Sequence, residues 1–135
     1  MKLDSIFTNI NALIKNNELH AFYQPIYDVE DNKIVAAEAL ARIVKKDGKI
    51  YPPNTFLPFI EESIDALTLD YHIIEDVCKL LSERKKRCIP LIPITINISK
   101  MHIYENDFVK KVTSLIEIIS SPDKSNIHAL LSDSK

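Results

Sequence analysis

Two strand-like runs near the start of the chain are separated by only five residues, and this short connection is the feature that most constrains the fold. Residues Ala21–Tyr27 and Lys33–Ile43 are rich in apolar side chains, and the segment between them is polar and turn-like. Parallel neighbours in a sheet need a crossover of about a dozen residues or more. If these two strands are adjacent in one sheet, they must therefore run antiparallel.

In four segments the pattern of residues predicts a helix, and one of these helices is expected to be short. The first is expected to open the chain at residues 3–15, and a short helix is expected at 55–62. A longer helix is predicted from apolar positions between residues 67 and 81, with Asp65 available as its N-cap. Residues 108–119 predict the last helix.

The order of these elements predicts the fold class. Residues 89–99 predict a strand between the long helix and the last helix, so strands and helices alternate from residue 33 onward. Long helical connections between strands imply a mainly parallel sheet with helices outside it. We therefore expect an α/β fold in which the first strand is the antiparallel exception, followed from residue 120 by a polar, frayed tail.

Charge and glycine content exclude several classes of function. The chain has 135 residues with 17 basic and 19 acidic side chains, so it has no broad positive field that would attract a nucleic acid. Its one glycine, Gly48, excludes the glycine-rich phosphate loops of Walker and Rossmann sites. No apolar run has the length of a signal peptide or of a membrane span, so we expect a cytoplasmic protein without a membrane partner.

The predicted strand at residues 94–99 alternates strictly between apolar and polar side chains. Isoleucines occupy one face, and Thr95, Asn97 and Ser99 occupy the other. A parallel strand that is covered on both faces would be almost continuously apolar. The polar face therefore lines either a wet cavity, such as the mouth of a barrel, or an exposed strand surface near a sheet edge.

The strand that ends at Ile43 carries an acidic residue inside an apolar run. Glu38, Leu40 and Arg42 lie on one face of this strand, and three alanines lie on the other. An unpaired carboxylate is costly to bury, so Glu38 must meet a cation, a metal or water. Arg42 lies about 13 Å from Glu38 along the strand, a spacing suited to the far end of one anionic ligand.

These residue types suggest metal-assisted phosphoryl chemistry. The Glu38 carboxylate and the Asn97 amide oxygen are suitable ligands for a hard divalent ion, and the Arg42 guanidinium suits a phosphate. The alternative is that these side chains are scattered polar residues on the surface of a sheet.

Four short blocks occur in a fixed order along the chain. They are Tyr23-Gln24-Pro25-Ile26, Ala37-Glu38-Ala39-Leu40-Ala41-Arg42, residues 53–62 and Ile96-Asn97-Ile98-Ser99. Together they resemble the N-terminal half of the EAL family, the bacterial cyclic di-GMP phosphodiesterases, over roughly residues 18–119. The family has a TIM-like (β/α) barrel whose first strand runs antiparallel to the others, which agrees with the direction argued from the short linker.

The resemblance implies a role for each candidate site residue. Glu38 and Asn97 would be ligands of a catalytic Mg²⁺ or Mn²⁺. Gln24, Leu40 and Arg42 would contact the substrate, with Arg42 on one of its phosphates. The metal would activate water for attack on one phosphodiester bond, which turns cyclic di-GMP into linear pGpG.

The chain departs from the family pattern in its last part. Residues 1–119, with a leading helix at 1–17, correspond to the N-terminal half of an EAL-like domain, and residues 120–135 are a divergent polar tail. Family members continue with further acidic strands, a paired-aspartate motif and a lysine-bearing strand, and a complete barrel needs about 250 residues. We therefore expect a partial barrel, truncated after about its third strand and the following helix, that binds metal weakly or not at all and is inactive alone.

Three interpretations remain open. The chain is a fragment of an EAL-type phosphodiesterase domain, a noncatalytic EAL-like module that acts through protein contacts or nucleotide sensing, or an α/β fragment with no independent role. Half a barrel has two free sheet edges, so we expect association with a second copy of the chain or with a partner protein.

Overall fold

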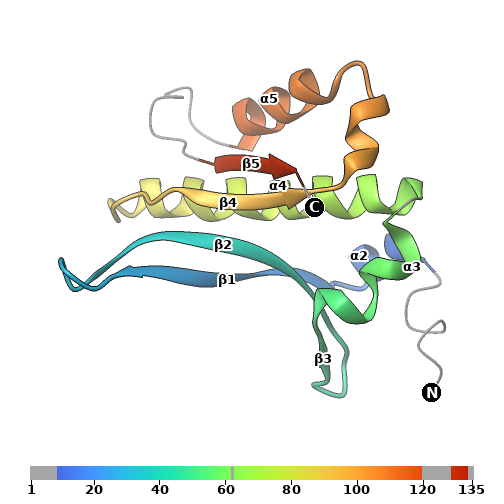
Figure 1. Cartoon of the computed structure of the whole chain (residues 1–135), viewed down its shortest axis with the longest axis horizontal. Coiled ribbons are helices and arrows are strands. Elements are labelled where there is room, and N and C mark those ends of the chain that lie inside the picture. The colour runs from blue at the N-terminus through green and yellow to red at the C-terminus, as the bar shows by residue number, and fades with distance from the viewer. Residues whose placement is uncertain (1–8, 62, 120–128, 134–135) are drawn as a thin grey trace.

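The computed structural model describes residues 9–61, 63–119 and 129–133. Figure 1 shows a curved sheet with the long helix α4 (Ile64–Lys86) running alongside it. A second helix, α5 (Phe108–Ile119), lies beside the part of the sheet that is farthest from the first strand. No helix in this described part of the chain combines the length and the apolar character that crossing a membrane requires.

The first two strands form an antiparallel hairpin, which confirms the prediction from the short linker. Strand β1 (Leu19–Asp28) pairs with strand β2 (Lys33–Val44), and Gln24 lies opposite Glu38 in the ladder. The Asp28 carboxylate stabilises the turn, because it accepts hydrogen bonds of 3.0 and 3.3 Å from two backbone amides that follow it. Side-chain acceptors of this kind favour a turn over continued strand.

Three further strands extend the described sheet. Strand β3 (Ile50–Tyr51) pairs antiparallel with the end of β2, and strand β4 (Ile94–Ile98) pairs parallel with the middle of β2. Strand β5 (Ala129–Asp133) pairs parallel with β4, so the order is β1-β2-β4-β5 with β3 beside β2. The long connection from β2 to β4 contains α4, as a crossover between parallel strands requires.

Two boundaries predicted from the sequence are wrong. Residues 89–93 precede β4 without joining a strand, because Pro90 and Pro93 lack the amide hydrogen that a ladder needs. Residues 129–133, predicted as part of a frayed tail, instead form β5, because their backbone pairs with the outer edge of β4. The sheet therefore extends one strand beyond the strand that was expected to be its last.

The remaining described helices are short. Three of them lie at or beside segments where a helix was predicted, whereas the one at residues 100–104 was not predicted. In chain order they are α2 (Ile10–Lys15), η1 (Pro53–Thr55), α3 (Leu57–Ile60) and η2 (Lys100–Tyr104). The predicted first helix also includes residues before 9, which lie outside the described part. Ser63, rather than the predicted Asp65, is the N-cap of α4, and Asp65 lies in the first turn, where a carboxylate interacts favourably with the helix dipole.

One face of the sheet packs against α4 and forms the core. Three alanines of β2 and the three isoleucines of β4 are buried on this face. The matching stripe on α4 is apolar, and its members in the core are Leu69, Ile73, Ile74, Val77, Cys78 and Leu81. Because alanine side chains are small, the helix and the sheet can approach closely at β2. The polar residues of both strands are thereby directed to the opposite face.

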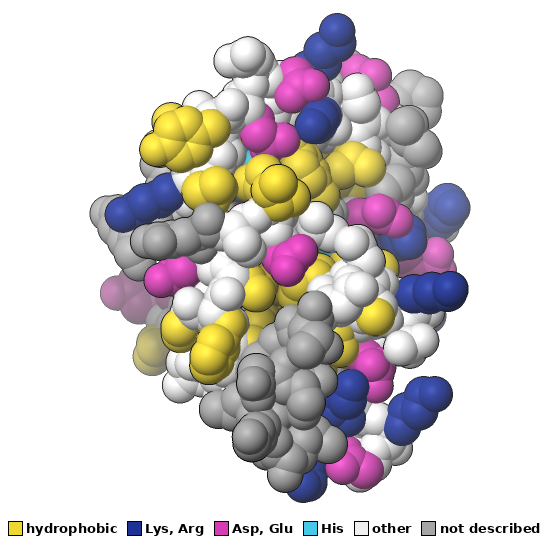
Figure 2. Space-filling model, turned by 90° about the vertical axis from the view of Figure 1, so that its right-hand side faces the viewer, with side chains coloured by type: hydrophobic (Ala, Val, Ile, Leu, Met, Phe, Trp, Pro, Cys, Tyr) yellow, Lys and Arg dark blue, Asp and Glu magenta, His cyan; other side chains and the backbone are white. Residues whose placement is uncertain are grey.

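Hydrophobic side chains also gather on the surface at one end of the molecule. Figure 2 faces this end, where α3, the start of α4 and η2 lie, and shows the hydrophobic side chains surrounded by charged ones. The large hydrophobic residues that are exposed on these elements are Phe59, Ile64, Ile103 and Tyr104. This end therefore presents an apolar surface as well as a charged rim.

The two faces of β4 should differ in their contribution to stability. Ile96 is fully buried, whereas Thr95 is half-buried on the opposite face. We expect Ile96→Ala to lower the free energy of unfolding by about 2–5 kcal/mol, because it removes buried methyl groups and leaves a cavity. The matched variant Thr95→Ala should cost less than about 1 kcal/mol. Urea denaturation measures both values, and equal losses would contradict the assignment of the strand faces.

Candidate functional site

The residues predicted to form a site lie on the sheet face that is directed away from α4. Glu38, Leu40 and Arg42 alternate with the buried alanines of β2, and each of the three is half-buried. Asn97 lies on the corresponding face of β4 and is exposed. Gln24 lies on β1 and pairs with Glu38 in the ladder. All five predicted residues therefore share one face of the sheet.

Glu38 and Asn97 are in direct contact on this face. Asn97 Nδ2 donates a hydrogen bond of 2.8 Å to Glu38 Oε2. The contact forms because β2 and β4 are parallel neighbours, with Glu38 in register with Thr95. The register with β1 brings Gln24 to the other side of Glu38. Three adjacent strands thus contribute one polar residue each to the same region.

Leu40 and Arg42 continue the same face toward the end of β2. Arg42 Nη1 donates a hydrogen bond of 3.0 Å to the backbone oxygen of Ala41. The central carbon of its guanidinium lies 6.0 Å from the centre of the Phe22 ring, a distance at which a cation and an aromatic face attract each other. Arg42 is therefore on the predicted face but separated from the Glu38–Asn97 pair, as four residues of strand require.

The Glu38–Asn97 pair offers oxygen ligands of the kind that Mg²⁺ and Mn²⁺ prefer. Two side chains fill only part of an octahedral coordination shell. Within the residues that the structure describes, no group of three or more His, Cys, Asp and Glu side chains is arranged to hold a metal ion. The metal-binding roles of Glu38 and Asn97 stay predictions that depend on their chemistry and their placement.

A second polar cluster, which the sequence did not reveal, lies where β4 ends. His102 in η2 is buried, and each of its ring nitrogens meets a carboxylate. Its Nε2 lies 2.9 Å from Asp70 Oδ2, and its Nδ1 lies 2.5 Å from Glu105 Oε1. The one signal in the sequence was Asp70, an acid within the apolar stripe of the long helix.

The same cluster holds the backbone at the end of β4. Asp70 Oδ2 accepts a hydrogen bond of 2.6 Å from the backbone amide of Ser99. Ser99 Oγ accepts a hydrogen bond of 3.1 Å from the backbone amide of Met101, which caps the start of η2. Because Ser99 is only two residues from Asn97, the buried cluster restrains the strand end that carries a predicted ligand.

Glu105 joins this cluster to two helices. The Tyr71 hydroxyl of α4 donates a hydrogen bond of 2.9 Å to Glu105 Oε1, and Lys111 Nζ of α5 donates one of 3.2 Å to Glu105 Oε2. Burial by itself would raise the pKa of the Glu105 carboxyl, but hydrogen bonds from His102, Tyr71 and Lys111 outweigh it and lower this pKa. Glu105 is therefore held as a charged carboxylate.

The pKa of Asp70 is shifted upward, in the opposite direction to that of Glu105, because Asp70 is more deeply buried. Loss of water around the carboxyl raises the pKa of Asp70 to about 6, although the Ser99 amide and His102 both favour its charged form. The two carboxylates that flank His102 thus have pKa values that are shifted in opposite directions. The difference follows from the deeper burial of Asp70 and from the larger number of side-chain donors that Glu105 meets.

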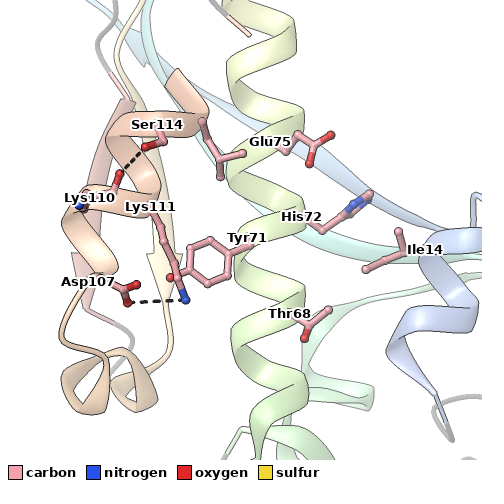
Figure 3. Close-up of a pocket in the computed structure, with 10 residues that line it drawn as sticks. Ile14, Thr68, Tyr71, His72, Glu75, Asp107, Lys110, Lys111 and Ser114 are labelled. Carbon is pink, nitrogen blue, oxygen red and sulfur yellow. Dashed lines mark hydrogen bonds and ion pairs between the residues drawn. The ribbon is translucent and has the colours of Figure 1, made fainter. Parts of the chain in front are cut away.

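Figure 3 shows a separate cavity of about 690 Å³ between α2, α4 and α5. It is lined by Ile14, Thr68, Tyr71, His72, Glu75, Asp107, Lys110, Lys111, Ser114 and Leu115. None of the five residues of the polar sheet face lines it. Two acids and two lysines contribute charges of both signs, so its lining does not select one class of ligand.

The chain matches a known protein family over most of its length. The family model described as the EAL domain matches residues 8–134. The chain is 29% identical over 104 residues to the oxygen sensor protein DosP of Escherichia coli K12, a match that covers 77% of this chain and 13% of DosP. It is 34% identical over 76 residues to the probable cyclic di-GMP phosphodiesterase PdeB of the same organism, covering 56% of this chain and 15% of PdeB.

The fold is also similar to that of a solved structure. The structure of the PaMucR phosphodiesterase in complex with c-di-GMP aligns with a TM-score of 0.79 at 17% identity, over 94% of this chain and 50% of that chain. Identity this low shows a likeness of fold alone. The chain therefore spans half the length of this structure and a much smaller share of the two curated relatives.

Asp70 should make the stability of the fold depend on pH in the acid range. Its pKa rises from 3.8 to about 6 on folding, so the folded chain binds this proton more tightly. Stability should therefore fall by up to about 3 kcal/mol as the pH rises from about 4 to about 6. Asp70→Asn keeps an oxygen for the Ser99 amide and should remove this fall, whereas Asp65→Asn in the same helix should keep it. Urea denaturation over this pH range measures both variants, and an unchanged slope in Asp70→Asn would contradict the prediction.

Proposed function

The chain belongs to the EAL domain family, and from this premise we propose that it forms part of a domain that hydrolyses cyclic di-GMP. The observation that carries the proposal is the contact of 2.8 Å between Glu38 and Asn97, an acid and an amide from adjacent strands on the polar face. The relative PdeB is named a probable cyclic di-GMP phosphodiesterase, which supports the same class of substrate. We also propose that the protein is cytoplasmic, as the sequence led us to expect.

Each residue of the polar face has a role in this proposal. Glu38 and Asn97 are the metal ligands, because their side chains meet at one place on the sheet and each carries an oxygen atom that can coordinate such an ion. Arg42 binds a phosphate of the substrate, since a guanidinium matches phosphate oxygens in charge and geometry. Gln24 and Leu40 line the substrate site beside them, with Gln24 offering hydrogen bonds and Leu40 an apolar surface.

A divalent ion, Mg²⁺ or Mn²⁺, is part of the proposal. When bound, such an ion would offset negative charge on the phosphate and raise the acidity of a water molecule. Glu38 and Asn97 would hold it, and they supply only part of its coordination shell. We therefore expect the 135-residue chain to bind the ion weakly and to show no hydrolysis by itself.

Manganese should bind at the polar face if Glu38 and Asn97 are ligands. In the ¹⁵N-labelled chain, we expect millimolar Mn²⁺ to broaden the side-chain amide signal of Asn97, because a paramagnetic ion acts on nearby nuclei. Glu38→Gln should reduce this broadening several-fold, since it removes the charge of one ligand. Glu30→Gln, at the exposed turn of the hairpin, is the matched control and should leave the broadening unchanged.

Two results would contradict this assignment of roles. Equal broadening of Asn97 in Glu38→Gln and in the wild-type chain would mean that Glu38 does not bind the ion. Linear pGpG that accumulates when the wild-type chain is incubated with cyclic di-GMP and Mn²⁺, and that disappears in Glu38→Ala, would mean that this chain is sufficient for hydrolysis. Nucleotide chromatography measures the second outcome.

A second candidate function is a noncatalytic module that acts through protein contacts. It is favoured by β1, which stands at one end of the described strand order and pairs there with β2. The hairpin that contains β1 also exposes large hydrophobic residues, namely Phe22, Ile26, Tyr27, Val29, Ile34 and Val35. An unpaired strand edge beside apolar side chains is a surface on which another strand can add.

This candidate function predicts that the chain associates at concentrations of tens of micromolar. We expect light scattering coupled to size exclusion to give a mass that rises with concentration. Ile26→Lys should shift the mass toward the monomer, because a lysine on an edge strand opposes strand addition. Asn54→Lys, on the exposed part of η1, adds the same charge elsewhere and should leave the mass unchanged. A monomer at every concentration would contradict association through this edge.

A further inference from the structure

Phe22 is a large apolar side chain among the polar residues of the candidate site. It lies on β1 and pairs with Leu40 of β2 in the antiparallel ladder. Because residues directly opposite each other point to the same side of a sheet, Phe22 shares the face of Glu38 and Arg42 and lies between them along the strands. Phe22 is 39% exposed, and its face is directed away from α4. Packing of the core against that helix therefore does not explain why an aromatic ring lies here.

The Phe22 ring meets the Arg42 guanidinium across the hairpin. Arg42 lies opposite His20, so Phe22 is its diagonal neighbour, and long side chains reach across such a diagonal. The central carbon of the guanidinium lies over the ring, 6.0 Å from its centre. Nη1 also donates a hydrogen bond of 3.0 Å to the backbone oxygen of Ala41. The guanidinium is thus held at two points, by a carbonyl of its own strand and by a ring of the neighbouring strand.

An aromatic ring is suited to hold a guanidinium that must also bind an anion. The ring attracts the cation through its π electrons, but it neither cancels the charge nor needs the planar fork of N–H donors that matches phosphate oxygens. A carboxylate in the same place would compete with a phosphate for both. The ring also limits the rotamers of the long Arg42 side chain, so less order has to be imposed when an anion binds.

We propose that Phe22 is a positioning residue for Arg42, and that its ring holds the guanidinium ready for a phosphate of a cyclic dinucleotide. The proposal rests on the proposed function, in which Arg42 binds a substrate phosphate. Phe22 acts through Arg42, so its contribution to binding requires the guanidinium. Loss of the ring leaves the charge of Arg42 in place, but binding of the nucleotide then includes the cost of ordering the side chain.

The contact itself can be observed without a ligand, by nuclear magnetic resonance on the ¹⁵N-labelled 135-residue chain. The ring current of Phe22 should shift the Nε–H signal of Arg42, which is identified by its loss in Arg42→Gln. Phe22→Leu keeps an apolar side chain without a ring, so this signal should move toward that of a freely rotating arginine. Phe22→Tyr keeps the ring and should preserve the shift. An unchanged Arg42 signal in Phe22→Leu overturns the proposal.

Titration of the same chain with cyclic di-GMP, in the presence of Mg²⁺, measures the effect on binding. We expect Phe22→Leu to raise the dissociation constant about two- to fivefold, whereas Phe22→Tyr should stay within about twofold of the wild-type value. Phe59→Leu is the matched control. It makes the same change on α3, where Phe59 is 59% exposed, and should leave the dissociation constant unchanged.

A double-mutant cycle separates positioning from direct contact between the ring and the nucleotide. If Phe22 acts through Arg42, Phe22→Leu should cause no further loss of binding in a chain that already carries Arg42→Gln. A ring that stacked on a base of the nucleotide would keep its effect in that chain. Persistence of the effect of Phe22→Leu therefore overturns the positioning role.

Failure of this proposal can be distinguished from failure of the proposed function. Arg42→Gln that binds as tightly as the wild-type chain, or a wild-type chain that shows no binding at millimolar nucleotide, overturns the phosphate role of Arg42, whatever its Nε–H signal shows. Weaker binding by Arg42→Gln together with unchanged binding by Phe22→Leu overturns the positioning role alone and leaves the phosphate role of Arg42 standing.

Discussion

The packing of one sheet face against α4 is the interaction on which the rest of the structure depends. It buries the alanines of β2 and the isoleucines of β4. Because successive strand residues alternate between faces, this burial directs Glu38, Arg42 and Asn97 to the opposite side. A shift of one residue in either strand would bring polar groups against the apolar stripe of α4, at a cost of several kcal/mol. The packing of the core therefore also fixes the face of the sheet on which the candidate site lies.

The helix that forms the core also restrains the strand that carries Asn97. Asp70 lies in the buried stripe of α4, yet its carboxylate binds the Ser99 amide at the end of β4. The cost of burying this charge appears as the raised pKa of Asp70. His102 and Ser99 offset part of that cost, because both donate to the same carboxylate oxygen. Asp70 therefore links α4, on the buried side of the sheet, to the end of the strand that carries Asn97 on the polar side.

Membership of the EAL domain family places this fold among structures with little sequence in common. The alignment with PaMucR reaches a TM-score of 0.79 at 17% identity. Two chains with such different sequences can share a fold because a core depends mainly on where apolar residues recur along the chain and on their total volume. The identity of each side chain matters less. The chain spans 50% of that structure, so the proposed hydrolysis is assigned to a domain to which this chain contributes the Glu38–Asn97 face.

The sequence by itself determined the features that depend on local pattern. The five-residue linker set the antiparallel hairpin, and the period of two placed Glu38 and Arg42 on one face of β2 and Asn97 on the polar face of β4, because both follow from chain geometry over a few residues. The tertiary structure alone decided the pairing of β5 with β4 and the contact between Asp70 and His102. Residues 32 positions apart form that contact, and no local periodicity encodes a partner at such a distance. These features arise only when the chain folds, because an unpaired strand edge and a buried carboxylate each need a partner from elsewhere in the molecule.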